Sequence, residues 1–159
     1  MTTIFEVLGR QHGELDTLFR QVHDALVSGR ESTARHRFAE LSTRLLGFMH
    51  AEHSIVYPQF AFMAGLEDEV RRAVREHDQI EQAINHLRLA PLSAEEFQGA
   101  LTRLQCLLAD HLETEEWILF PVATLRLSGD DARRIAAEYL AYEPVAMSVA
   151  QPSITYDAA

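Results

Sequence analysis

Histidine and acidic side chains stand one helical turn apart at two places in this sequence. His111 precedes Glu115 by four residues, and His77 precedes Glu81 by four, so each pair lies on one face of a helix. Imidazole and carboxylate groups together form a ligand set that suits iron, manganese or zinc. The two pairs therefore indicate a transition-metal site, if the fold brings their helices together.

An internal repeat points to the same parts of the chain. Residues 52–58 match residues 115–121 in their glutamate, isoleucine and proline. His12 also matches His77 when the apolar and acidic residues that follow each of them are aligned. A proline inside a helix costs about 3 kcal/mol and kinks it. The repeat therefore predicts two helix pairs with matching kinks, each shortly after a glutamate.

Helical phase separates buried polar residues from solvated ones. A helix turns about 100° per residue, so the apolar stripe of each segment defines the direction of the core. The polar residues on these stripes are His12, Asp16, Glu52, His77, Glu81, His111 and Glu115. Burying several carboxylates is costly unless a cation neutralises them, and the nearby arginines fall away from the stripes.

A metal ion is the simplest source of that positive charge. Bundle cores that receive Glu and His from facing helices are where dinuclear carboxylate sites are built. We therefore predict iron, with two ions per chain as the leading assignment, and mononuclear iron, manganese or zinc as alternatives. The predicted metal ligands are His12, Glu52, His77, Glu81, His111 and Glu115.

Long helices must position these residues. Only seven glycines and five prolines interrupt the chain, and apolar residues recur at three- and four-residue spacing between them. The pattern predicts an all-α protein, an up-down-up-down four-helix bundle. The predicted helices span residues 3–27, 32–64, 67–89 and 93–127, with a short fifth helix over residues 130–142. We expect the bundle domain to span residues 1–142 and an irregular C-terminal tail to span residues 143–159.

The charge balance is unfavourable for two classes of partner. The 14 basic residues are scattered and stand against 24 acidic ones, which gives a formal net charge of −10. Nucleic acids and anionic membranes are bound by clustered basic residues. The sequence has one cysteine, no apolar run of about 18 residues, and several charges among its first fifteen positions. We therefore expect no nucleic acid partner, no membrane association and a cytoplasmic location, and we leave a homo-oligomer open.

The order of these motifs resembles that of the hemerythrin-like family of HHE cation-binding bundles. The resemblance covers about residues 3–126 and rests on His12, on Glu52 ahead of Tyr57-Pro58, on Glu76-His77, and on His111 with Glu115 ahead of Phe120-Pro121. It implies a non-haem di-iron centre bound by these histidines and by two bridging carboxylates. It also implies a role in binding or sensing oxygen, nitric oxide or redox state.

One position departs from the family pattern. The family has a histidine four residues before the second-helix glutamate, where this sequence has Phe48. His53 lies about 100° around the helix from Glu52, and His50 lies about 160° around it, so His53 is the better substitute. Tyr57, beside the kink, either packs in the core or reaches a metal. One half of the site is therefore expected to be short of nitrogen.

Three functions stay open at this point. The first is a module that binds or senses oxygen, nitric oxide or redox state. The second is an oxidoreductase that acts on peroxide or nitric oxide, for which a vacant coordination position on the metal would be needed. The third is an interaction bundle in which the histidines and glutamates form only a buried hydrogen-bond network.

Overall fold

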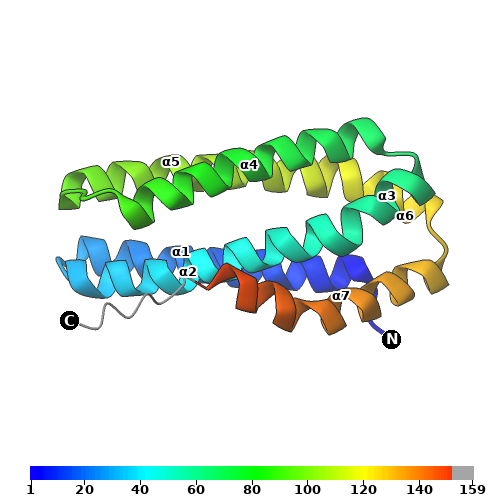
Figure 1. The fold of residues 1–159 in the computed structure, drawn as a ribbon, viewed down its shortest axis with the longest axis horizontal. Helices are drawn as coiled ribbons and strands as arrows, with labels where there is room; N and C mark the ends of the chain where they lie inside the picture. The colour runs from blue at the N-terminus through cyan, green and yellow to red at the C-terminus, as the bar shows by residue number, and fades with distance from the viewer. Residues whose placement is uncertain (152–159) are drawn as a thin grey trace.

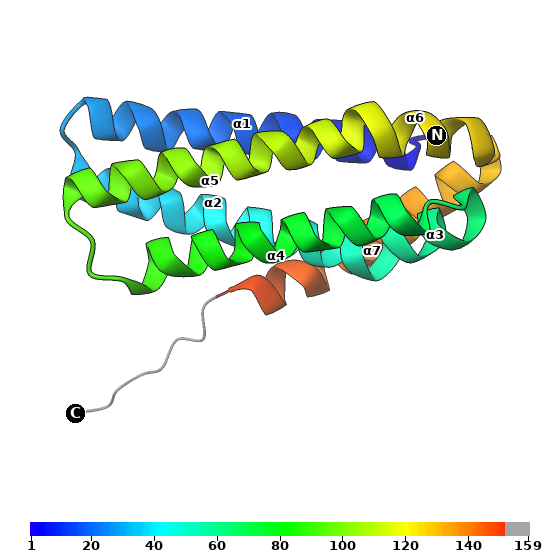
Figure 2. The ribbon, with the colours of Figure 1, turned by 90° about the horizontal axis from the view of Figure 1, so that it is seen from above.

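The computed structural model describes residues 1–151, which are almost entirely helical. Four long segments lie side by side along the molecule, and α7 lies against one side of them (Figures 1 and 2). The prediction of an all-α helical bundle is confirmed. The elements are α1 (Ile4–Val27), α2 (Glu31–Ala51), η1 (Glu52–Val56), α3 (Tyr57–Ala64), α4 (Glu67–Leu89), α5 (Ala94–Thr114), η2 (Glu115–Leu119), α6 (Phe120–Arg126) and α7 (Gly129–Ala150). The elements α2, η1 and α3 run on as one long segment, as do α5, η2 and α6.

The helix ends follow from local groups in the sequence. The Ser93 hydroxyl accepts a hydrogen bond from the Glu96 backbone N–H, and the Glu96 carboxylate accepts one from the Ser93 N–H. This reciprocal pair satisfies two N–H groups that have no partner inside the helix, and it starts α5. Gly29 and Gly65 have φ values of 68° and 61°, which glycine adopts without strain, and they follow the ends of α1 and α3.

The two predicted kinks take the form of π turns. The turns η1 and η2 begin at Glu52 and Glu115, and a proline lies two residues beyond each turn. The first backbone N–H after each turn bonds to the carbonyl of that glutamate, five residues back. Pro58 and Pro121 have no N–H to donate, and their rings crowd the preceding turn, so a wider turn relieves the clash. Each glutamate therefore lies where its helix is locally widened.

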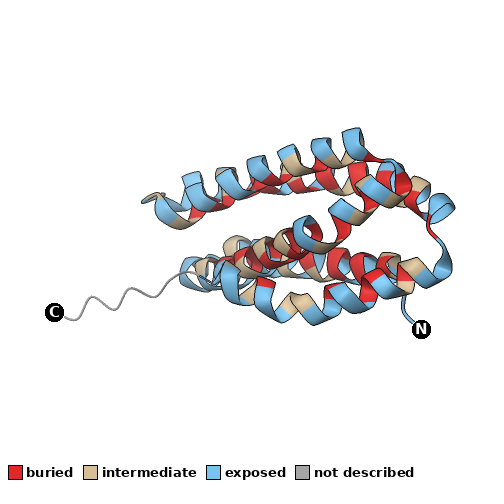
Figure 3. Cartoon of the chain, turned by 45° about the vertical axis from the view of Figure 1, so that its right-hand side comes forward, coloured by how far each residue is buried: buried red, intermediate tan, exposed pale blue. Residues whose placement is uncertain are grey.

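Two apolar clusters fill the interior of the bundle. One cluster joins the start of α1 to α3, α6 and α7, and it includes Leu8, Phe60 and Ile135. The other joins the rest of α1 to α2, α4 and α5, and it includes Phe19 and Phe48. Buried residues line the facing sides of the helices, whereas exposed residues lie on the outside (Figure 3). The core is thus divided into two parts along the length of the bundle.

The fifth helix is longer than predicted. The prediction of an irregular tail from residue 143 is wrong for residues 143–150, which belong to α7. Pro144 lies inside this helix, on its exposed side, and the carbonyl that loses its helical partner belongs to the exposed Leu140. Water can bond to that carbonyl, so the proline is tolerated. The rest of the predicted tail, residues 152–159, lies outside the described residues.

Packing against α2 explains why α7 continues past the proline. Ala146 is fully buried, and α7 lies along α2 over much of its length. Gly47 on α2 makes room for this contact, because a Cβ atom there would overlap the Met147 side chain. The buried contact outweighs the missing hydrogen bond. Within residues 1–151, no helix combines the length and the apolar character needed to cross a membrane.

Candidate metal centre

Five ionisable side chains form a buried polar layer between the two apolar clusters. Along α1 the layer separates Leu8 from Leu15, which belong to different clusters. The layer receives one residue from each of α1, η1, α4, α5 and η2. Each is at most 8% exposed, and they are His12, Glu52, His77, His111 and Glu115. Such residues are almost never fully buried unless they are paired or bind an ion.

One side of the layer is built by two imidazoles and a carboxylate. The Nε2 atoms of His77 and His111 lie 3.0 Å apart. The Nε2 atom of His77 also lies 3.3 Å from a carboxylate oxygen of Glu52. One ligand atom from each of these three residues lies within 4.8 Å of the other two. The group therefore offers three donors to one ion.

The other side of the layer has a single imidazole. His12, Glu52 and Glu115 form a second group whose ligand atoms lie within 4.8 Å of one another. The Oε2 atom of Glu115 is 3.1 Å from His12 Nε2 and 3.7 Å from His111 Nε2. Glu52 belongs to both groups, and Glu115 approaches a histidine of each. The two carboxylates thus lie where they can bridge two ions.

The spacing of these donors fits a metal better than it fits a hydrogen-bond network. Ligands about 2.1 Å from one ion lie about 3.0 Å apart at right angles and about 3.4 Å apart at the tetrahedral angle. The close pairs in the layer are separated by 3.0 to 3.7 Å. His12 Nε2 and Glu115 Oε2 approach to 3.1 Å, yet within residues 1–151 neither of these buried atoms has a hydrogen-bond partner. Donors that face a common point in this way suit a shared cation.

Two carboxylates outside the layer orient two of the histidines. Glu116 lies 2.8 Å from His12 Nδ1, and Glu76 lies 3.1 Å from His111 Nδ1. Glu76 also accepts a hydrogen bond from Thr114 Oγ1 at 3.0 Å. A carboxylate on the outer nitrogen fixes the ring and directs Nε2 toward a metal. Neither glutamate was predicted to have this role, because both lie off the apolar stripe of their own helix.

Tyr57 reaches into the layer from the start of α3. Its hydroxyl donates a hydrogen bond to Glu115 Oε1 at 2.7 Å and lies 3.1 Å from His77 Nε2. The side chain is 1% exposed. Burial, together with the negative charges of Glu115 and Glu52, raises the pKa of Tyr57 well above its usual range. The neutral phenol is therefore the stable form while the site holds no cation.

Protons carry the positive charge of the metal-free site. Burial and repulsion from Glu115 raise the pKa of Glu52 to about 8. Burial opposes charge on Glu115 as well, but the imidazoles of His111 and His12 outweigh it and lower the pKa of this carboxyl. Burial opposes protonation of His12, and Glu115 outweighs it, which raises the pKa of His12 to about 9. Burial and the nearby His111 lower the pKa of His77 to about 3.

Comparison with known proteins agrees with this geometry. Residues 3–123 match the family described as the hemerythrin HHE cation binding domain. The chain belongs to this family. A protein named DNA nickase, from Nostoc sp. (strain PCC 7120), is 22% identical over 138 residues. The match covers 87% of this chain but only 38% of that protein, so the chain spans well under half of the relative's length. No match was found among solved structures.

The structure does not bring every predicted ligand of this hemerythrin-family chain into the polar layer. Glu81 is exposed and lies outside both groups of donors. Asp16, which was expected on the core side of α1, is 69% exposed and pairs with Arg20 at 3.3 Å. Asp16 and Glu81 each follow a histidine of the layer by four residues. One turn beyond the histidine, the same face of each helix is exposed to solvent. Helical phase alone did not reveal this difference.

The position that departs from the family pattern is filled by a core residue. Phe48 is 2% exposed and belongs to the second apolar cluster. His53 is exposed and lies outside the layer, so it does not replace the missing histidine. His50 contacts the Tyr142 hydroxyl at 3.1 Å, away from the layer. The site is asymmetric, because one side has the imidazole of His12 alone and the other has those of His77 and His111.

Proposed function

We propose that this hemerythrin-family chain is a non-haem iron protein with two irons per chain, and that it binds or senses oxygen, nitric oxide or redox state. The observation that carries the proposal is the buried polar layer, in which two donor groups share Glu52. His77, His111 and Glu52 would hold one ion, and His12, Glu52 and Glu115 would hold the other. Bound iron would supply a reversible change of oxidation state and positions for a small ligand.

The chain's own residues control what reaches such a centre. The apolar clusters on both sides exclude bulk water from the layer, which strengthens its electrostatic interactions. Glu76 and Glu116 hold two of the imidazoles in place. The His12 side has one nitrogen donor, so we propose that its ion is bound more weakly and is more open to ligands than the ion on the His77 side.

Tyr57 is a further candidate donor on the His77 side. Its oxygen lies as close to His77 Nε2 and Glu115 Oε1 as neighbouring ligands of one ion lie to each other. A bound cation would stabilise the negative charge of the phenolate, so it would favour loss of the phenol proton. Ferric iron bound to a phenolate absorbs visible light, and a Tyr57→Phe variant would lose that absorption.

The same hydroxyl favours a second candidate function, an oxidoreductase that acts on peroxide or nitric oxide. Such chemistry needs a group that can give up a proton beside the reacting ligand. Tyr57 is a buried O–H donor in contact with the layer. Turnover of peroxide or nitric oxide by the iron-loaded protein, lost in Tyr57→Phe at unchanged iron content, would support this function over binding alone.

Metal content is the first test of the proposal. We would measure iron, manganese and zinc per chain in freshly purified protein, with optical spectra in air and after anaerobic reduction. About two irons per chain support the dinuclear site, and about one supports loss of the ion on the His12 side. Glu52→Gln should lower the content, whereas the exposed Glu113→Gln should not. No metal after anaerobic iron loading would contradict the proposal and favour an interaction bundle.

The match to a DNA nickase does not extend the proposal to nucleic acid. The chain's formal net charge of −10 repels a phosphate backbone, and its identity to that longer protein is 22%. We therefore propose small ligands of iron, and neither nucleic acid nor a membrane, as the partners of this chain.

A further inference from the structure

Three hydrogen-bonded side chains fix one imidazole of the polar layer. The Glu76 carboxylate lies 3.1 Å from His111 Nδ1, and it accepts a hydrogen bond from Thr114 Oγ1 at 3.0 Å. Thr114 is 2% exposed and the Glu76 side chain is 16% exposed, so water competes little for these contacts. A carboxylate that is itself held in this way fixes the orientation of the His111 ring.

All three members of this group are replaced in the other half of the chain. The internal repeat aligns His12 with His77, and it aligns Glu52 with Glu115. The residues at the three equivalent positions are Gln11, Phe48 and Ala51, in place of Glu76, His111 and Thr114. None of the replacements carries a charge. The imidazole and the two groups that would fix it are therefore missing together on the His12 side.

Gln11 bonds to α7 instead. Its side chain is 7% exposed. The Nε2 atom donates a hydrogen bond to Glu143 Oε1 at 3.1 Å, and the Oε1 atom accepts one from the Tyr139 hydroxyl at 2.6 Å. The helix that supplies both partners begins at residue 129, beyond residues 3–123, which match the family. Both polar atoms of the amide are thus held by an element outside the matched region.

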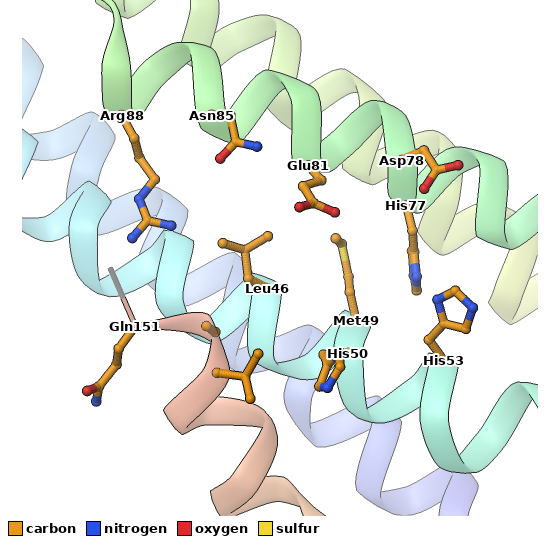
Figure 4. Close-up of a pocket in the computed structure, with 12 residues that line it drawn as sticks. Leu46, Met49, His50, His53, His77, Asp78, Glu81, Asn85, Arg88 and Gln151 are labelled. Atoms are coloured by element: carbon orange, nitrogen blue, oxygen red, sulfur yellow. The ribbon is translucent and has the colours of Figure 1, made fainter. Parts of the chain in front are cut away.

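The same face of α7 packs against α2. Met147 lies four and eight residues after the two residues that bond to the amide, so all three share one face of α7. The Met147 side chain lies against Gly47. Figure 4 shows the last turns of α7 beside the part of α2 that carries Leu46 and Met49. Phe48 belongs to this part of α2, so α7 contacts both helices at the place where the group is missing.

We propose that Gln11 and Phe48 act as a matched pair that keeps the ion near His12 loosely bound, and that α7 holds this pair in place. The inference rests on the proposed metal-binding function, and it makes Gln11 a positioning residue and not a ligand. A carboxylate on the outer nitrogen of a ligand histidine contributes about 10- to 100-fold to metal affinity. The Gln11 amide cannot supply that charge, so an imidazole at position 48 would lack its support.

The test is a double-mutant cycle on the binding of Co²⁺ to metal-free protein. The affinity of the ion near His12 is measured by visible absorption in competition with a chelator. One change is Phe48→His. The other is Gln11→Glu together with Glu143→Gln, which moves one negative charge from α7 to α1 and leaves a donor and an acceptor in the pair. The net charge of the protein is unchanged, so a general effect of charge is controlled.

The two changes should be strongly coupled. Independent changes would multiply, whereas we expect the combined variant to bind the ion about 10- to 100-fold more tightly than that product. In the Co²⁺ protein, the new histidine should add an exchangeable N–H signal to the paramagnetically shifted proton NMR spectrum. That proton should exchange with water more slowly when residue 11 is a carboxylate, and a merely structural effect on the fold would not produce this difference.

The other half of the bundle supplies the matched control. Glu76→Gln and His111→Phe copy the residues found at positions 11 and 48. Glu76→Gln alone should weaken the ion on the His77 side by about 10- to 100-fold, but it should have little further effect once His111 is phenylalanine. Thr114→Val should weaken this ion less than Glu76→Gln does, because the carboxylate remains. Circular dichroism of each metal-free variant checks that it is folded.

The outcomes distinguish the two proposals. A combined variant that binds the ion no more tightly than the product of the single effects would overturn the matched pair and leave the metal centre standing. The full gain from Phe48→His alone, with a slowly exchanging N–H proton, would also overturn it, because Gln11 would then have no part. If the original protein binds neither Co²⁺ nor iron, the proposed function itself fails.

Discussion

The two buried tyrosines of this bundle give a matched test of the charge in the polar layer. Tyr57 is 1% exposed and donates a hydrogen bond to Glu115 at 2.7 Å, whereas Tyr139 is 0% exposed and donates one to Gln11 at 2.6 Å. The two bonds are alike in length and burial, but the acceptors differ. The pKa of Glu115 is lowered, so the acceptor of the Tyr57 hydrogen bond is an ionised carboxylate. The acceptor of the Tyr139 hydrogen bond is the neutral amide of Gln11. Replacement by phenylalanine removes one hydroxyl in each case.

The expected losses of stability follow from the acceptors. A hydrogen bond to a charged group contributes about 1.5–3 kcal/mol, and one between neutral groups contributes about 0.5–1.5 kcal/mol. We expect Tyr57→Phe to lower the free energy of unfolding of the metal-free protein by about 2 kcal/mol and Tyr139→Phe by about 1 kcal/mol. For a chain of this length, 1 kcal/mol corresponds to about 2–4 °C in Tm. The Tm should therefore fall by about 6 °C and about 3 °C.

Urea and thermal unfolding of chelator-treated protein at pH 7 would measure both losses. The m-value should be the same for the three proteins, so that the midpoints report stability alone. In iron-loaded protein, the visible spectrum should change in Tyr57→Phe and stay the same in Tyr139→Phe. Equal losses of stability for the two variants would refute the conclusion that Tyr57 bonds to an ionised carboxylate in the metal-free site.

Three further predictions concern the metal and its protons. Removal of bound metal by a chelator should lower the Tm, by about 5–11 °C if the free metal had stood at 100 times its Kd, as a thermal scan with and without chelator would show. In metal-free protein the pKa values of His12, about 9, and Glu52, about 8, are both raised, so the stability they contribute is present at low pH and is lost as pH rises. The loss begins above the ordinary pKa of each group, 4.5 for Glu52 and 6.5 for His12, and is complete once pH has passed the raised values, so urea unfolding should show it between about pH 5 and 9. Loaded protein should not share this loss. Metal binding at pH 7 should release about two protons into a weakly buffered solution. Phe48→His should add the imidazole that the His12 side lacks and raise the metal content toward two per chain, as measured by elemental analysis, while Phe48→Leu should not.

The helices could be predicted from the sequence because their signals are local. Glycine, proline and a capping pair mark the ends of four segments, and apolar spacing marks their inner faces. The end of α7 could not be predicted in this way, because Pro144 gives the opposite local signal. The helix continues because Ala146 is buried and Met147 fits over Gly47, and that contact joins residues 100 positions apart in the sequence. Tertiary packing overrode the local preference.

The buried members of the site could be predicted, but their neighbours could not. Helical phase gives the direction of a side chain from its own helix, and this was enough for His77 and Glu115. Helical phase does not show whether neighbouring helices cover that side chain, so Glu81 was predicted to be buried although it is exposed. It also does not show that Glu76 and Glu116, which point away from their own stripes, meet histidines of a neighbouring helix. Those contacts depend on how the helices pack against each other.

Differences between the two repeats explain why the site is asymmetric. The glutamate and the proline of each kink are shared, so both repeats deliver a carboxylate from a π turn. Four residues before the glutamate, one repeat has His111 and the other has Phe48; one residue before the proline, one has Phe120 and the other has Tyr57. The phenol contacts His77, on the side that already has two imidazoles, so it does not make up for the nitrogen lost at Phe48. Phe48 therefore weakens the His12 side, and Tyr57 adds a group to the His77 side. The ion near His12 should accordingly be the first to leave when metal is removed in steps.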